Sequence, residues 1–129
     1  MGKCLRALKG LIFLANRTEE AKQMLESMES LIQFELYGEE PFYVEIKNGK
    51  MVLKDGKVGN ASATITCESQ TFYRIIMGEI DQEEAFVKKL YQISGSITDA
   101  VRFRRISQIV QERNKGKINF LLKFGRLFL

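Results

Sequence analysis

The stretch from residue 69 to residue 97 constrains the fold of this chain most strongly, because its turn residues and apolar spacing predict a definite order of elements. The apolar residues between 72 and 76 share one helical face, and Gly78 follows where a helix C-cap takes a residue of positive φ. Asp81 then lies at the N-cap of a second short helix, and Glu84 completes a capping-box pattern. Two helices joined by a tight turn are therefore expected.

Beyond residue 90 the spacing of apolar residues changes to two, which is typical of a strand with one buried face. Thr98 or Asp99 is then expected to cap a long helix, because apolar residues recur at helical spacing from Ala100 to Val110. The apolar side of the strand comprises Tyr91, Ile93 and Ile97, and its polar side comprises Gln92, Ser94 and Ser96.

Three earlier stretches also alternate apolar and polar residues and predict strands with one wet face. Their inward residues are Ile32, Phe34 and Leu36, then Phe42, Val44 and Ile46, and then Ala63, Ile65 and Cys67. Asn48-Gly49 is typical of a two-residue hairpin, and Asp55-Gly56 marks a second turn. We therefore expect a meander of four antiparallel strands, to which the helical pair adds a fifth strand.

Two helices are expected before the first strand. Residues 1–16 predict an N-terminal amphipathic helix, and we prefer this interpretation to a signal peptide because the apolar run is short and no cleavage pattern follows. Thr18 is expected to cap the second helix. The first helix carries Lys3, Arg6 and Lys9 opposite Leu5, Leu8 and Ile12, and the second is apolar at Ala21, Met24, Leu25 and Met28.

These elements predict the α+β class. With 129 residues, one proline and no low-complexity tract, the chain is expected to form a single domain over residues 1–129. Its outward strand residues are consistently polar, so the helices should cover only the other face of the sheet. We expect a five-stranded, mostly antiparallel sheet with one face covered by four to five helices.

The pattern of turn, capping and apolar residues in the middle of the chain resembles that of the sterol carrier protein 2 family of lipid-binding domains. The matching residues are Gly78, Asp81, Ala85, Phe86, Ile93, Gly95 and Ala100, and the resemblance covers roughly residues 20–113. At Lys89 the chain departs from the family, which usually has glycine there. The resemblance implies an apolar tunnel between sheet and helices, and a free-standing, prokaryotic-type member with a cytoplasmic location.

The function that this resemblance implies is non-catalytic binding and transport of a lipid. Fatty acid, acyl-CoA, sterol-like and isoprenoid ligands all remain open, because nothing in the sequence distinguishes them. The residues expected to contact the lipid are Phe72, Ile76, Phe86, Phe103 and Ile106, with Phe120 and Phe124 as lid contacts.

Residues 117–129 are expected to form an amphipathic C-terminal tail in a basic part of the chain. Residues 98–129 hold eight Lys or Arg and two Asp or Glu, a net charge of +6, whereas the first 97 residues carry −2. Three interpretations of the tail remain open: packing on the domain or in a homodimer, a lid over a lipid opening, and peripheral contact with an anionic membrane. The alternative function is a scaffold or accessory protein that docks a partner enzyme or membrane surface through this tail.

Several chemistries are excluded by composition. The sequence has no histidine, which removes catalytic and metal sites built on imidazole. Cys4 and Cys67 lack the spacing of a metal site or disulfide scaffold, and no phosphate-binding or dinucleotide motif is present. No recognised nucleic-acid motif accompanies the basic residues. We therefore expect no enzyme activity, no cofactor or metal, and no nucleic-acid partner.

Overall fold

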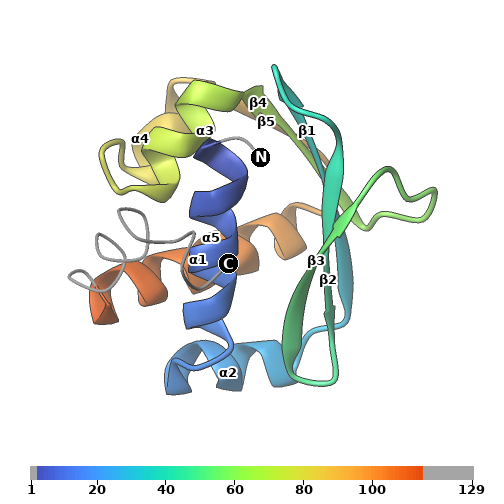
Figure 1. Cartoon of the computed structure of the whole chain (residues 1–129), viewed down its shortest axis with the longest axis vertical. Coiled ribbons are helices and arrows are strands. Elements are labelled where there is room, and N and C mark those ends of the chain that lie inside the picture. The colour runs from blue at the N-terminus through green and yellow to red at the C-terminus, as the bar shows by residue number, and fades with distance from the viewer. Residues whose placement is uncertain (1–2, 115–129) are drawn as a thin grey trace.

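The computed structural model describes residues 3–114, which form a five-stranded sheet and five helices. The elements in chain order are α1 (Lys3–Ala15), α2 (Glu19–Glu26), β1 (Ser30–Tyr37), β2 (Phe42–Lys47), β3 (Lys50–Asp55), β4 (Ala63–Glu68), α3 (Ser69–Ile76), α4 (Gln82–Val87), β5 (Tyr91–Gly95) and α5 (Ile97–Arg113). Figure 1 shows the sheet on the right and the helices on its left. The expected α+β class, with one covered sheet face, is confirmed.

The strand order is β3-β2-β1-β4-β5, so β4 pairs with β1 rather than with β3. This pairing is parallel and begins where Ile32 lies opposite Ala63, whereas the other three pairings are antiparallel. The sheet is mostly antiparallel as expected, but the meander of four antiparallel strands is wrong. The first three strands form a meander, and the fourth crosses to the far side of β1.

Gln33 explains why the crossover was not recognised. The alternation of polar and apolar residues in β1 predicts that Gln33 faces solvent. The side chain is only 3% exposed, because the loop of residues 56–62 passes over it. Its side-chain oxygen accepts from the Val58 N–H at 2.9 Å, and its amide nitrogen donates to the carbonyls of Phe42 and Gly56 at 2.9 and 3.1 Å. The crossover loop projects on the outer side of the sheet in Figure 1.

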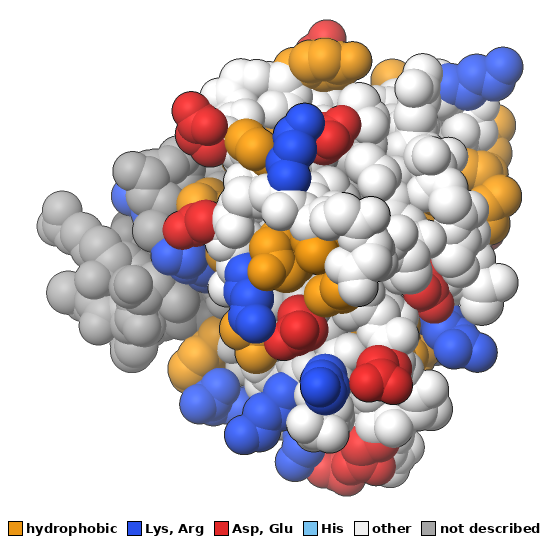
Figure 2. All heavy atoms as spheres, turned by 90° about the vertical axis from the view of Figure 1, so that its right-hand side faces the viewer, with side chains coloured by type: hydrophobic (Ala, Val, Ile, Leu, Met, Phe, Trp, Pro, Cys, Tyr) orange, Lys and Arg blue, Asp and Glu red, His pale blue; other side chains and the backbone are white. Residues whose placement is uncertain are grey.

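The rest of the outer face of the sheet meets solvent, as its polar residues predicted. Figure 2 views the molecule from this side, where acidic and basic side chains are interspersed with apolar ones. Lys54 pairs with Glu45 at 3.1 Å, and Lys57 of the crossover loop pairs with Glu35 at 3.5 Å. These exposed ion pairs contribute little stability individually, so the face is held mainly by strand pairing and by Gln33.

The turn between α1 and α2 secures the edge strand β3. The Asn16 amide donates to the Met51 carbonyl and accepts from the Met51 N–H, both at 2.8 Å, so it occupies backbone groups that an edge strand would otherwise leave open. Thr18 occupies the N-cap position of α2 as expected, but its hydroxyl donates to the Leu14 carbonyl at 2.7 Å and does not cap α2.

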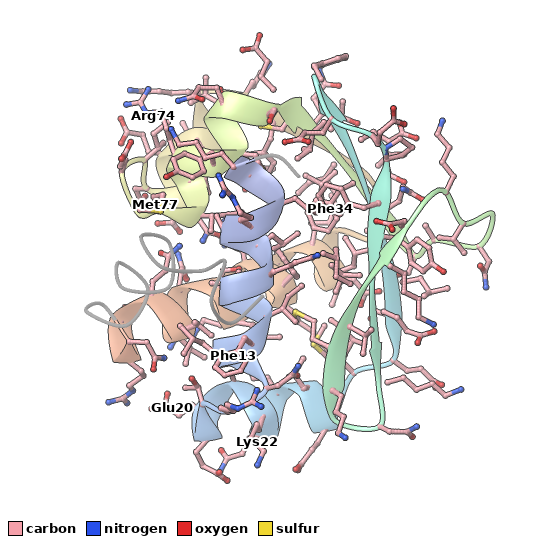
Figure 3. All side chains as sticks on the ribbon, viewed as in Figure 1. Phe13, Glu20, Lys22, Phe34, Arg74 and Met77 are labelled. Atoms are coloured by element: carbon pink, nitrogen blue, oxygen red, sulfur yellow. The ribbon has the colours of Figure 1, made fainter. Side chains whose placement is uncertain are left out.

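The core lies between the inner face of the sheet and the helices. Figure 3 shows Phe34 projecting from the sheet toward α1, and its ring contacts those of Phe42, Phe72 and Phe103 at centroid distances of 5.2, 5.3 and 5.4 Å. Helix α1 packs against α3 and α5. The predicted basic side of α1 is exposed only near the start of the helix, and after Lys9 almost every residue of α1 is buried. Helix α1 is therefore a core helix along its second half.

The predicted helical pair is confirmed in detail. Helix α3 ends before Gly78, which has φ of +78°, and the Asp81 carboxylate accepts from the Glu84 N–H at 3.0 Å to cap α4. Lys89, at the end of this unit, has φ of +57°. This left-handed conformation suits glycine best, which gives a physical reason for the glycine found at this position in the family that the sequence resembles.

Two details of the following segment differ from expectation. Strand β5 ends at Gly95, so Ile97 begins α5 and is 59% exposed instead of lying on the buried side of a strand. The cap of α5 is Ser96, whose hydroxyl accepts from the Asp99 N–H at 3.1 Å, and neither Thr98 nor Asp99 fills that role. The strand is shorter than predicted because Ser96 continues the alternation of Gln92 and Ser94 in the sequence, although it caps the helix in the structure.

Candidate functional site

An apolar cavity of about 40 Å³ lies between the sheet and helices α3, α4 and α5. Its lining residues are Ile65, Phe72, Ile75, Gln82, Tyr91, Ile93, Ala100, Phe103 and Arg104. The volume suffices for a few water molecules and is far below the roughly 300–1,000 Å³ of a typical small-molecule pocket. In this closed form the cavity marks a place where packing is incomplete.

Secondary structure places these side chains together in a simple way. Ile65 of β4 lies opposite Ile93 of the edge strand β5, so the two side chains share the inner face of the sheet. On α5, Ala100, Phe103 and Arg104 are spaced by three and four residues and therefore share one helical face. The cavity adjoins the aromatic core, because the Phe103 ring also contacts Phe34.

Three residues bring polar groups to this apolar space. The Tyr91 hydroxyl donates to the backbone carbonyl of Gln82 at 3.5 Å, which links β5 to α4. Burial raises the pKa of Tyr91, although the nearby Arg104 guanidinium partly opposes this rise. Tyr91 therefore remains a neutral hydroxyl at physiological pH, beside a permanently charged guanidinium.

Comparison with known proteins assigns this fold to a family. Residues 10–108 match the model of the SCP-2 sterol transfer family. The chain belongs to the SCP-2 sterol transfer family. The resemblance read from Gly78, Asp81 and the following residues is thus confirmed, and family membership supports lipid binding or transfer as the functional class. No curated protein sequence matches this chain.

Solved structures of low sequence identity share the SCP-2 fold with this chain. The "UbiJ-SCP2 Ubiquinone synthesis protein" has a TM-score of 0.65 at 11% identity, with 78% of this chain and 84% of that chain covered. Sterol carrier protein domain 2 of Helicoverpa armigera has a TM-score of 0.64 at 16% identity, covering 81% and 87%. Apo sterol carrier protein 2 of Yarrowia lipolytica has a TM-score of 0.60 at 16% identity, covering 80% and 88%.

The residues expected to contact lipid occupy three different environments. Phe72 and Phe103 line the cavity, whereas Ile76 and Ile106 are buried in the adjoining core and do not line it. Phe86 is 44% exposed on α4, and its ring contacts that of Tyr91 at a centroid distance of 5.9 Å. Phe120 and Phe124, with the tail of residues 117–129, lie outside the described residues.

The polar residues of this cavity were not predicted from the sequence. Tyr91 and Ile93 were assigned to the buried side of a strand, but nothing local indicated that they face a cavity rather than filled core. Arg104 entered the sequence analysis only as one of the eight Lys or Arg residues between 98 and 129. Its signal was its position four residues after Ala100, on the apolar side of α5, where a charged residue is unusual.

Other chemistry within residues 3–114 is sparse. No group of three or more Cys, Asp or Glu side chains in this part of the chain could hold a metal ion. None of its helices combines the length and apolar character needed to cross a membrane. Burial raises the pKa of the Cys4 thiol to about 12 and that of Cys67 to about 11, so both are protonated and poor nucleophiles near neutral pH.

Proposed function

We propose that this SCP-2 protein is a non-catalytic lipid carrier that holds an acyl or isoprenoid chain between β4–β5 and helices α3 and α5. The observation that carries this proposal is the apolar cavity between the sheet and helices α3 and α5, which the first residue of α4 also lines and which adjoins the aromatic cluster of the core. A lipid tail would extend along Phe72 and Phe103. Ile76 and Ile106 would supply the next layer of contacts.

The cavity must widen to take a lipid, and α4 is the element best suited to move. Only Gln82 and Ala85 are buried on this helix, while Phe86 and Val87 are exposed. Displacing α4 therefore removes little apolar surface from the core, which keeps the free energy of opening small. The exposed apolar residues of α4 would contact the membrane while a lipid enters.

A bound chain gains affinity from burial alone. Each buried methylene contributes about 0.8 kcal/mol, so ten methylenes supply roughly 8 kcal/mol before the losses of freedom on binding. After about 2–4 kcal/mol of opening and ordering, roughly 4–6 kcal/mol remains, so the expected dissociation constant is on the order of 10⁻⁵ to 10⁻³ M. This range suits a carrier that must also release its lipid.

Native mass spectrometry of the purified protein tests the proposal directly. A mass increase of one lipid per chain, with the lipid then extracted and identified, is the expected result. The control is the same protein delipidated and incubated with mixed lipids. An apo mass that stays unchanged after this incubation would contradict the carrier function.

Filling the mouth of the cavity should block lipid binding without unfolding the domain. Ile93 is partly exposed on an edge strand, so Ile93→Trp can be accommodated at the surface while its ring occupies the opening. We expect at least a tenfold loss of affinity for hexadecanol in a fluorescence displacement assay, equivalent to about 1.4 kcal/mol.

The matched control is Val52→Trp, on the other edge strand and on the outer face of the sheet, where Val52 is 44% exposed. This variant should bind hexadecanol like the original protein. If Ile93→Trp keeps its circular dichroism spectrum and binds hexadecanol equally well, the lipid does not use this cavity.

A further inference from the structure

The polar groups of the cavity converge from three elements and are rich in hydrogen-bond donors. Gln82 comes from the start of α4, Tyr91 from β5 and Arg104 from α5, and all three line the same apolar space. Tyr91 lies close to both other residues. Its hydroxyl is 3.5 Å from the backbone carbonyl oxygen of Gln82, and the nearby Arg104 guanidinium lowers its pKa. A guanidinium offers only donors, a side-chain amide adds two N–H donors, and a hydroxyl adds one O–H donor.

Arg104 lacks a counter-ion within the described part of the chain. It is partly buried, yet no Asp or Glu of residues 3–114 approaches it within 4.0 Å, although five other Lys or Arg residues form such pairs. The sequence after residue 114 contains no Asp or Glu either. A partly exposed guanidinium that lines an apolar cavity and forms no ion pair with residues 3–114 can attract an anion that is not a side chain.

Gln82 provides an independent observation. It is 8% exposed and faces the cavity, and its side-chain amide forms no hydrogen bond to any residue between 3 and 114. No buried side-chain nitrogen or oxygen of the described residues lacks a hydrogen-bond partner, so this amide is not a buried, unsatisfied group. Gln82 nevertheless lines the cavity, and its NH₂ group can donate to the same oxygen atoms that Arg104 attracts.

We propose that Arg104, Tyr91 and Gln82 form the headgroup end of the lipid site and bind the anionic group of a single-chain lipid, a carboxylate or a phosphate, whose tail passes Phe72 and Phe103. The proposal rests on the carrier function proposed above and names its ligand class. Arg104 forms a bidentate ion pair with the headgroup, because the guanidinium fork matches both anions. Gln82 orients the headgroup with a hydrogen bond from its amide, and Tyr91 does so by turning its hydroxyl proton from the Gln82 carbonyl to the headgroup.

Three ligands with the same sixteen-carbon chain separate headgroup recognition from tail binding. Hexadecanoic acid, hexadecyl phosphate and hexadecanol are compared at pH 8 by displacement of a neutral pyrenyl alkanol. The protein should bind one or both anions at least about tenfold more tightly than the alcohol, the gain expected of a charge-assisted pair. Preference for only one anion identifies the headgroup as carboxylate or phosphate.

Arg104→Gln should reduce this preference to about twofold or less while hexadecanol still binds, which also confirms that the variant is folded. The matched control is Arg105→Gln, the same change at an exposed neighbour on α5 that should keep the preference. Tyr91→Phe removes only the hydroxyl and should lower anion affinity by a few-fold, which provides a second variant if Arg104→Gln does not fold.

The outcomes separate this inference from the proposed function. If the original protein binds all three ligands with equal affinity, or if Arg104→Gln retains the anion preference, the headgroup site is wrong and the carrier function stands. If none of the three ligands binds, the carrier function itself fails.

Discussion

Gly95 lies opposite Ala63, where β5 ends and β4 begins. It has φ of +87°, and a Cβ atom added there would lie 2.6 Å from the Ser62 carbonyl oxygen. Gly95→Ala combines a left-handed conformation that L-residues resist with a backbone clash that cannot relax locally. We expect the free energy of unfolding, measured by urea denaturation, to fall by about 2–4 kcal/mol.

Gly59→Ala provides the control for Gly95→Ala. Gly59 lies in the crossover loop with open space around its Cβ position and without a positive φ, so alanine there should leave stability nearly unchanged. Equal stability of the two variants would mean that Gly95 is not required for the junction of β4 and β5.

At the residue scale, local chemistry was readable from the sequence and long-range chemistry was not. Gly78 and Asp81 were predicted correctly because a C-cap and an N-cap depend on neighbours within four residues. Ser96, Thr98 and Asp99 can all cap a helix, and three such residues within four positions leave the start of α5 ambiguous. The importance of Arg104 depends on Tyr91 and Gln82, whose proximity no local pattern contains.

At the scale of elements, Gln33 provides buried side-chain hydrogen bonds to the first part of the crossover between β3 and β4. Gln33→Met keeps the volume of Gln33 but removes its hydrogen bonds to Phe42, Gly56 and Val58. We expect a loss of about 1–3 kcal/mol in the free energy of unfolding, because buried backbone groups lose their partners. The freed loop should also be cleaved faster by trypsin after Lys57, measured by gel densitometry.

Gln92→Met is the matched control on β5, where Gln92 is exposed and none of the hydrogen bonds among the described residues involves its side chain. It should change neither stability nor cleavage at Lys57. Should Gln33→Met behave like this control, the crossover loop is held by other contacts.

The pairing of elements also marks where sequence reasoning stopped. Each strand was located from its alternation, and the hairpin at Asn48-Gly49 followed from its turn residues. The parallel pairing of β1 with β4 had no such signal. Whether β4 pairs with β1 or with β3, the side chain of Ile65 is buried on the same face of the sheet. Only the burial of Gln33 distinguishes the two arrangements, and a polar residue in an alternating strand is ordinarily read as exposed.

At the scale of the whole molecule, the two buried thiols make stability depend on alkaline pH. Their pKa values, about 12 for Cys4 and about 11 for Cys67, lie above the ordinary value of 9.0 that holds after unfolding. The stabilisation is therefore complete below pH 9 and is lost as pH rises through 11 to 12. Between pH 8 and 10.5 we expect each thiol to contribute a loss on the order of 2 kcal/mol.

Urea denaturation at pH 8 and at pH 10.5 measures this dependence. The Cys4→Ala/Cys67→Ala variant should lose distinctly less stability between the two pH values, since lysine and tyrosine titration is common to both proteins. A pH dependence identical to that of the original chain would contradict the thiol assignment.

The volume of the candidate site is a property of the whole molecule and was hidden from the sequence. Phe72 and Phe103 lie on apolar helical faces and line the cavity, whereas Ile76 and Ile106 have the same kind of spacing and are buried in the core beside it. Close-packed and incompletely packed interiors use the same residue types. What distinguishes them is whether side chains from distant segments meet, which composition does not record.

The burial of α1 has a consequence for synthesis of the chain. Its second half is apolar on nearly all sides, and two of its partners, α3 and α5, end at Ile76 and Arg113. At about 5–20 residues per second, α1 leaves the ribosome roughly 5–20 s before α5 is complete. An isolated helix of this length is only marginally stable in water. During that interval the nascent chain presents Leu8, Leu11 and their neighbours without partners, which makes this segment a natural target for ribosome-associated chaperones.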